Sequence, residues 1–508
     1  MFRKIQKNLL INHPLLWNSK IVPLTFFAVV FHIIFFLIGY VRGTIDFTET
    51  DTNYSFDASE GTLIFFSVLI SILSLIIWCV YYFKNNALKS FYPKNNFSLF
   101  KEWLLIFFGS LLIVTFLVSY FYGKETRVRS YFTENEARKR TEILSLGSFF
   151  VNGSYSYYYD NDVAEVVETE PNVDDTIRVN QKNYILYKGK KYSANSLLNK
   201  NINSYSFIDA KKDSIYVDRI KNLLVTNQKD SIQKIFKNYL AIAKEHNLKS
   251  SIDDKKWLQL IYDYPTFENY KTIGSEEKDV YYLENNDYDK SKIDTTEQYL
   301  VQEKEGNFLY NRFYVPEKQL HHAYQKISNS YTNPTISWES YLIALYVALG
   351  VSLLLFSFRV TSGKNWLITL VSLGVLNILI GIITAIFGSE YVYLSGILII
   401  FTFSFLYFIT TISAQKGKGI SGITINAMLW ILPAFAPIMY FFILEITKKI
   451  SGYNNAVGLS RDILYPKITF LQDSGFLFFL TYLNLLFVVI IMLYLSKKIK
   501  QWRGIAEN

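Results

Sequence analysis

About eight long apolar runs constrain this chain more than any other feature of its sequence. A helix of roughly 20 residues crosses a bilayer core of about 30 Å, and each run approaches or exceeds that length with no charge near its centre. Hydrophobic residues make up 50% of the chain and charged residues only 19%, which is unlike a soluble protein. We therefore predict a polytopic α-helical membrane protein, with spans at 21–41, 62–83, 103–122, 341–358, 366–387, 393–412, 420–446 and 475–495.

A polar stretch at 124–338, rich in Tyr, Asn, Lys and Asp, follows the third span and leaves five spans after it. Residues 149–158 hold an Asn-Gly pair between aromatic residues and predict a β-hairpin, and residues 184–192 predict a second strand pair. Apolar residues recur at helical spacing at 230–246 and 253–262. The expected architecture is three spans, an α+β domain and five spans.

Lysine and arginine residues gather on one side of this arrangement. The positive-inside rule then places both termini in the cytoplasm and the polar domain outside it. Abundant Lys, Asn, Ile and Tyr, with Cys79 as the single cysteine, favour the inner membrane of a bacterium. The expected segments are a cytoplasmic interfacial amphipathic segment at 1–20, spans at 21–123, the extracytoplasmic domain at 124–338, spans at 339–496 and a basic cytoplasmic tail at 497–508. An ordinary basic leader to the first span is an equal alternative for residues 1–20.

Catalytic and nucleotide-binding motifs are missing from the sequence. No GxxxxGK[ST] or HExxH occurs, and the GxSG at 419–422 has no histidine after it to serve as a base. The basic residues flank apolar runs and form no aromatic-interleaved stripe, which argues against nucleic acid. We expect no enzymatic activity, no cofactor and no metal site.

Three polar residues lie near the centres of spans, namely His32, Asn377 and Asn484. Such residues join helices through hydrogen bonds or contact a substrate, and the sequence leaves both roles open. Within the spans the sequence places only one charged residue, Glu445, near an outer end, which disfavours a proton-coupled transporter. Two further sets have structural roles: Gly374, Gly381 and Gly388 predict close helix packing, and Pro433 and Pro437 predict a kink.

From the third span onward, one span, a large external domain and five spans follow each other. This layout resembles the ABC-2-type permeases of ATP-binding-cassette exporters, although two extra spans precede it and no ATPase is fused to the chain. The resemblance implies a separate ATPase subunit, dimeric action in the lipid bilayer and a lipid-like or peptide cargo. It also implies basic partner contacts on the cytoplasmic loops, with candidates Lys84, Lys89, Lys94, Lys101, Arg359, Lys364, Lys416 and Lys418.

Two functions are therefore expected in order of preference. The first is a non-catalytic transmembrane subunit of an ABC-type exporter, and the alternative is a membrane-anchored sensor or assembly scaffold whose external domain binds a ligand or an envelope protein. An intramembrane enzyme ranks last, because the sequence shows no nucleophile, base or metal site.

Overall fold

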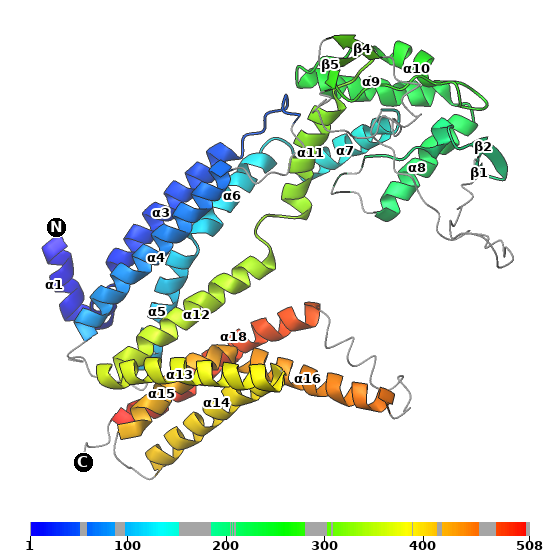
Figure 1. Cartoon of the computed structure of the whole chain (residues 1–508). Helices are drawn as coiled ribbons and strands as arrows, with labels where there is room; N and C mark the ends of the chain where they lie inside the picture. Colours follow the sequence, from blue (N-terminus) through cyan, green and yellow to red (C-terminus); the bar gives the residue numbers. More distant parts are fainter. Residues whose placement is uncertain are drawn as a thin grey trace. The chain divides into compact units, whose positions relative to one another are not determined.

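The chain divides into two compact units. The structure, a computed structural model, describes residues 2–50, 58–86, 97–151, 184–203, 205, 207, 210–279, 302–305, 308–388, 390–413, 419–456 and 474–503. One unit, here called the membrane unit, comprises Met1–Gly39, Phe56–Gly123 and Ile336–Asn508, and the other, the polar unit, comprises Tyr40–Ser55 and Lys124–Thr335. Figure 1 shows the elements in chain order from blue to red.

Helices alone form the described part of the membrane unit, and two of them reach a few residues into the polar unit. They are α1 (Phe2–Asn12), α2 (Pro14–Ser19), α3 (Ile21–Arg42), α4 (Ala58–Asn86), α5 (Ser98–Val114), α6 (Phe116–Arg129), α12 (Trp338–Val360), α13 (Gly363–Phe387), α14 (Glu390–Ser413), α15 (Gly419–Ile431), the short 3-10 turn η5 (Leu432–Ala434), α16 (Phe435–Ala456) and α18 (Ser474–Arg503).

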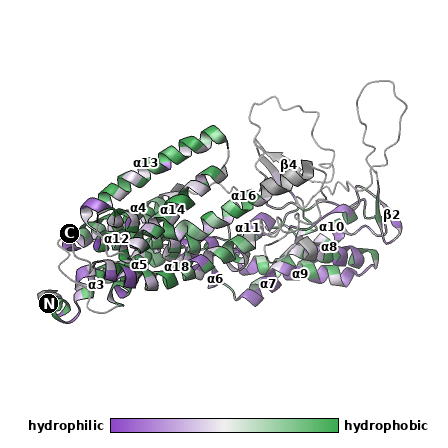
Figure 2. Cartoon of the chain, turned by 90° about the horizontal axis from the view of Figure 1, so that it is seen from below, coloured by the Kyte–Doolittle hydropathy of each residue, from purple (hydrophilic) through white to green (hydrophobic). Residues whose placement is uncertain are grey.

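Among the described residues, seven helices are long and apolar enough to cross a membrane. The count rises to eight if α5 and α6, which are bent by 51° at a break of one residue, together form one span. Figure 2 shows these helices as mostly hydrophobic along their length. The prediction of a mainly helical, multi-pass membrane protein is confirmed at this level.

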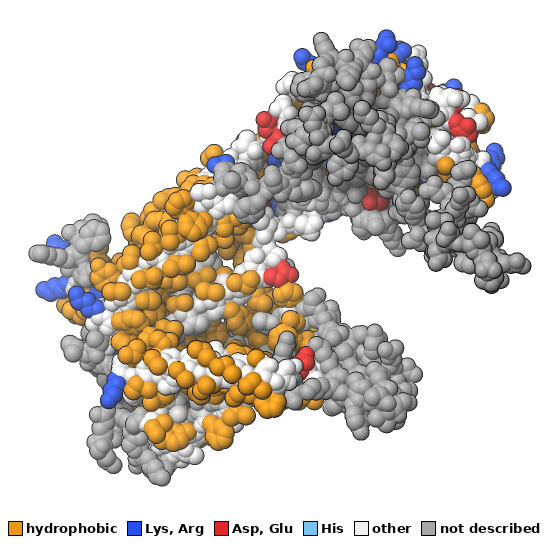
Figure 3. All heavy atoms as spheres, in the orientation of Figure 1, with side chains coloured by type: hydrophobic (Ala, Val, Ile, Leu, Met, Phe, Trp, Pro, Cys, Tyr) orange, Lys and Arg blue, Asp and Glu red, His pale blue; other side chains and the backbone are white. Residues whose placement is uncertain are grey.

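The membrane unit has an interior built mainly on α5 and α12. Trp103 of α5 and Phe356 of α12 are fully buried, and the Trp103 indole Nε1 donates to Ser352 Oγ of α12 at 3.2 Å. In the most apolar stretch of α12, half of the residues are buried. In the corresponding stretch of α13, none of the residues is buried. Figure 3 shows hydrophobic side chains covering the outer helices, as expected of surfaces that face lipid.

The polar unit combines helices with two small sheets. Its elements are α7 (Glu134–Ser148), β1 (Tyr184–Tyr187), β2 (Lys190–Ser193), the 3-10 turn η2 (Leu197–Asn199), α8 (Ala210–Val225), α9 (Lys229–Glu245), α10 (Asp254–Ile261), β3 (Lys278–Asp279), β4 (Gln302–Glu305), β5 (Phe308–Asn311) and α11 (Glu317–Thr332). β1 pairs with β2, and β3, β5 and β4 form an antiparallel sheet in that order.

Strand predictions in the polar unit have two outcomes. The pair at 184–192 is confirmed: Tyr187 faces Lys190 across a two-residue turn, whose Lys188 and Gly189 both have positive φ as a type I′ turn requires. The hairpin predicted at 149–158 is wrong at its start, because residues 149 and 150 form a turn directly after α7 and Val151 makes only an isolated bridge to Ile273. Residues 152–158 lie outside the described residues.

The core of the polar unit gathers α7, α9, α10 and α11. α9 turns Ile232, Phe236 and Tyr239 inward at the spacing of one helical face. Asp253 directly precedes α10, and its side chain accepts from the Lys256 amide at 2.7 Å and so caps the helix. The same core includes Ile45, from the loop between α3 and α4.

Candidate functional site

A buried ion pair joins the beginning of α5 to the end of α12. Arg359 Nε donates to Glu102 Oε1 at 3.0 Å, and the two side chains are 1% and 2% exposed. Arg359 lies in the last turn of α12, where the helix dipole favours a positive charge. Ionisable residues inside a membrane protein are costly, so such a pair marks a candidate functional site.

Besides Arg359, two polar side chains lie beside the carboxylate of Glu102, and a third, Asn86, contacts one of them. Asn18 Nδ2 lies 3.4 Å and Tyr82 Oη 3.5 Å from Glu102 Oε1, and Asn18 Nδ2 also donates to Asn86 Oδ1 at 2.7 Å. All of them are buried. We call Asn18, Tyr82, Asn86, Glu102 and Arg359 the polar centre; it links α2, α4, α5 and α12 in one hydrogen-bonded cluster.

The polar centre corrects two predictions made from the sequence. Arg359 was predicted as a candidate contact for a cytoplasmic partner, but its side chain is 1% exposed and paired with Glu102 inside the unit. Glu445 was expected as the only charged residue within a span. Glu102 and Arg359 also lie within apolar helices, because α5 and α12 extend beyond the predicted ends of their runs.

His32 on α3 contacts the break between α5 and α6. Its Nε2 lies 2.8 Å from the Leu112 carbonyl and its Nδ1 2.6 Å from Ser119 Oγ. A carbonyl can only accept, so Nε2 carries the proton and Nδ1 accepts from the serine. Leu112 is in the last turn of α5, where carbonyls lack helical partners, and the imidazole therefore caps a broken helix.

Asn484 on α18 makes a similar contact at the predicted proline kink. Pro437 has no N–H, so the carbonyl of Pro433 lacks its usual helical donor. Asn484 Nδ2 supplies that donor at 2.7 Å and also lies 2.8 Å from Tyr346 Oη. The 3-10 turn η5, which includes Pro433, lies at this position, and the helices on its two sides count as one span.

This contact predicts a coupling between Asn484 and Pro437. Asn484→Ala should destabilise the membrane unit by about 1–3 kcal/mol, because it leaves a buried carbonyl without a donor. In a Pro437→Ala background the restored amide can bond to Pro433, and the same replacement should cost clearly less. Detergent unfolding of the four proteins of this double-mutant cycle measures the difference. Equal losses in both backgrounds would contradict the assigned role.

The remaining candidates, Asn377 and the three glycines, belong to α13 or its C-cap, and α13 is an exposed helix. Asn377 is exposed, and its Oδ1 accepts from Tyr393 Oη of α14 at 2.5 Å. A Cβ built on Gly374 or Gly381 would meet no described atom within 4 Å, so the predicted close packing is not found within one copy of the chain. Gly388 ends α13 in the left-handed conformation with φ 61°, which is a capping role and not a packing one.

The basic partner candidates divide into three groups. Lys84, Lys101 and Lys364 are exposed, near the ends of α4, α5 and α13 that adjoin the polar centre in the sequence. Arg359 is buried, as described above. The other four, Lys89, Lys94, Lys416 and Lys418, lie outside the described residues.

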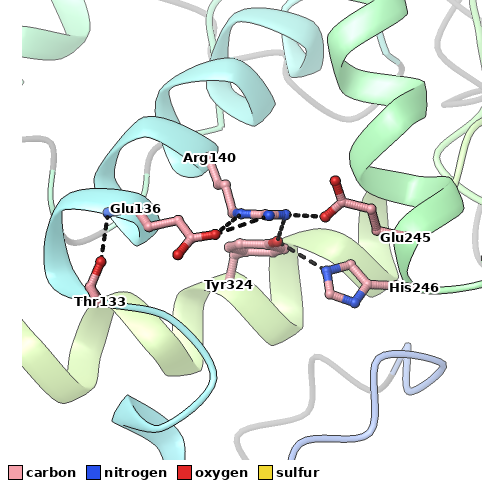
Figure 4. A network of polar contacts seen from close by, with 6 residues as sticks. All are labelled: Thr133, Glu136, Arg140, Glu245, His246 and Tyr324. Atoms are coloured by element: carbon pink, nitrogen blue, oxygen red, sulfur yellow. Dashed lines mark hydrogen bonds and ion pairs between the residues drawn. The ribbon is translucent and has the colours of Figure 1, made fainter.

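A second polar network holds α7, α9 and α11 of the polar unit together (Figure 4). Arg140 of α7 pairs with Glu136 and with Glu245, and its Nη1 lies 3.4 Å from Tyr324 Oη. Tyr324 Oη in turn lies 3.0 Å from His246 Nε2. Burial, and then the charge of Arg140, lower the pKa of His246, while the charge of Glu245 acts in the opposite direction.

The loop between α3 and α4 docks onto this network. The Phe47 ring stacks on the His246 ring, with centroids 3.7 Å apart and planes inclined by 8°. Glu49 pairs with Lys326 at 3.0 Å and with His322 at 3.2 Å, and the hydrogen bond from Lys326 lowers the pKa of its carboxyl. We call residues 43–50 the docking loop; its sequence reads only as a short acidic connection.

No cluster of three metal-binding side chains occurs in the part of the chain that the structure describes. The two units thus present two candidate sites of different kinds: a buried ion pair in the membrane unit, and a charged aromatic network in the polar unit. Comparison with family models, with curated proteins and with solved structures finds no match for this chain.

Proposed function

We propose that the chain is the non-catalytic transmembrane subunit of an ABC-type exporter, which moves or hands over a lipid-like or peptide cargo with energy from a separate ATPase. The observation that carries this proposal is the Glu102–Arg359 ion pair. In chain order, α5 and α6 precede the polar unit and α12 follows it. The ion pair therefore joins the helix that leads toward the polar unit to the helix that leads away from it. A movement imposed at this point acts on both helices at once.

Exposed lysines support a docking surface beside the polar centre. Lys101 precedes Glu102 directly, and Lys364 follows Arg359 by five residues. In the proposed orientation these ends face the cytoplasm, where an ATPase would bind. The pair then couples the bound ATPase to the polar unit. Breaks in α5–α6 and at η5 also favour transport, because discontinuous helices at membrane depth are frequent in transporters.

Purification from the native host in mild detergent tests the proposal. A nucleotide-binding protein should copurify with the wild-type chain, and Lys101→Glu with Lys364→Glu should reduce its recovery at least tenfold. Lys234→Glu with Lys237→Glu, two exposed lysines on α9 of the polar unit, is the matched control and should leave recovery unchanged. Absence of any nucleotide-binding protein from the wild-type preparation removes the main support for an exporter.

The alternative is a membrane-anchored sensor or assembly scaffold. It is favoured by the independent core of the polar unit, which suits a binding module held by the spans. Replacing both 43–50 and 130–335 by short Gly/Ser linkers separates the two functions. An exporter subunit should still retain its ATPase, whereas a scaffold should lose every specific partner.

A further inference from the structure

α1 is an amphipathic helix in which Lys4, Ile5, Lys7, Leu10 and Ile11 are exposed and Leu9 is only partly buried. At about 100° per residue, Ile5 and Leu9 share one face, Lys7 lies opposite that face, and Lys4 lies about 120° from its centre. Lys4, Lys7 and Ile5 are exposed, Ile5 by 41%. Isolated helices of fewer than about 12 residues are marginal in water. With its 11 residues, α1 therefore needs a surface to be stable.

The chain after α1 restricts what that surface can be. α2 is fixed to the membrane unit, because Asn18 and Ser19 are buried and Trp78 Nε1 donates to the Ser19 carbonyl at 2.9 Å. Only residues 13–20 separate α1 from α3, which is apolar enough to cross the membrane. The helix is thus tethered within a short distance of the point where α3 enters the bilayer.

Charge identifies the kind of lipid. Arg3, Lys4, Lys7 and Lys20 precede or flank the start of the first span, and the first acidic residue of the chain is Asp46. Lys20 Nζ lies 3.8 Å from the centre of the Trp17 ring, a pair of residue types that favours the headgroup region. This stretch presents only positive charge and an apolar face. We infer that α1 lies on the bilayer and binds anionic phospholipid headgroups through Lys4 and Lys7.

This inference does not depend on the exporter proposal, because it concerns only the attachment of α1 to lipid. A basic residue close to an anionic membrane surface strengthens attachment about fivefold. Replacing both lysines should therefore weaken it about 30-fold. Salt should weaken it too, since headgroup attraction is screened beyond about 10 Å at moderate ionic strength.

Hydrogen exchange of the amides of residues 2–12 tests the inference in the full-length protein. Wild-type chain in nanodiscs of equal parts phosphatidylcholine and phosphatidylglycerol should exchange these amides far more slowly than in phosphatidylcholine alone. Lys4→Gln with Lys7→Gln should remove about 30-fold of that protection. Lys234→Gln with Lys237→Gln, which has the same spacing on α9, should retain it.

Two results would overturn the inference. One is equal protection of α1 in both lipid compositions, which means that protein contacts or the apolar face alone hold the helix. The other is an equal loss of protection in the α9 control, which means that net charge matters and the position of the lysines does not. Added salt gives an independent reading, because protection that survives high salt is not attraction to headgroups.

Discussion

Arg359→Leu is expected to destabilise the membrane unit by about 3–5 kcal/mol, the cost of leaving one partner of a buried ion pair unpaired. The Glu102 carboxyl group would be left with only the weaker contacts from Asn18 and Tyr82, at 3.4 Å and 3.5 Å. Unfolding of the detergent-solubilised protein by a denaturing detergent measures the loss. If the ion pair couples the ATPase to the polar unit, the amount of ATPase that copurifies from the host should also fall.

The double variant Arg359→Leu with Glu102→Gln separates the stranded charge from lost packing. Glutamine keeps an acceptor for Asn18 and Tyr82 but carries no charge, so most of the lost stability should return. Lys101→Ala, one residue away and exposed, is the matched control and should change stability by less than about 0.5 kcal/mol. A double variant as unstable as Arg359→Leu alone would show that packing and not charge is responsible.

Trp257→Ala should have an equally large effect in the polar unit, about 3–5 kcal/mol. Trp257 is fully buried, stacks on Phe236 with centroids 4.3 Å apart, and meets Tyr239 edge to face at 5.4 Å. Its removal leaves a cavity between α9 and α10. Calorimetry of the purified protein should show the transition of the polar unit shifted to lower temperature and that of the membrane unit unchanged.

Trp257→Phe is the informative companion to this variant. Phenylalanine keeps a ring beside Phe236, and the indole Nε1 that it removes has no hydrogen-bond partner among the described residues. The loss should therefore be much smaller than with alanine. Tyr264→Ala, at a ring that is 50% exposed, serves as the control for aromatic loss without a cavity. A shift of both transitions in Trp257→Ala would show that the two units unfold together.

Hydropathy was sufficient to predict seven of the eight runs as helices long and apolar enough to cross a membrane, because this depends on local composition alone, but it did not indicate that the third run is broken and bent by 51°. It could not predict the polar centre. Glu102 and Arg359 lie just outside the predicted runs and are 257 residues apart in the chain, so each reads as an ordinary flanking charge. Their burial depends on α5 packing against α12, and a single sequence carries no signal of that contact.

The proline and asparagine positions show the same limit. Pro433 and Pro437 predict a weakened helix from local chemistry, and the 3-10 turn η5 lies there. The donor that satisfies the exposed carbonyl comes from Asn484, 51 residues away. The docking loop is a third example, because Phe47 reads as one aromatic residue in a short acidic connection until His246 is beside it.

The docking loop also sets an order of events during synthesis. Glu49 and its partner Lys326 are 277 residues apart, and synthesis proceeds at about 5–20 residues per second. Roughly 15–55 s therefore pass between the emergence of the loop and the emergence of α11. Throughout that interval Glu49 lacks its partner Lys326, and the core around Ile45 lacks the residues that α11 supplies. The polar unit therefore cannot be complete until α11 has been synthesised, although its first segment, the docking loop, emerges long before.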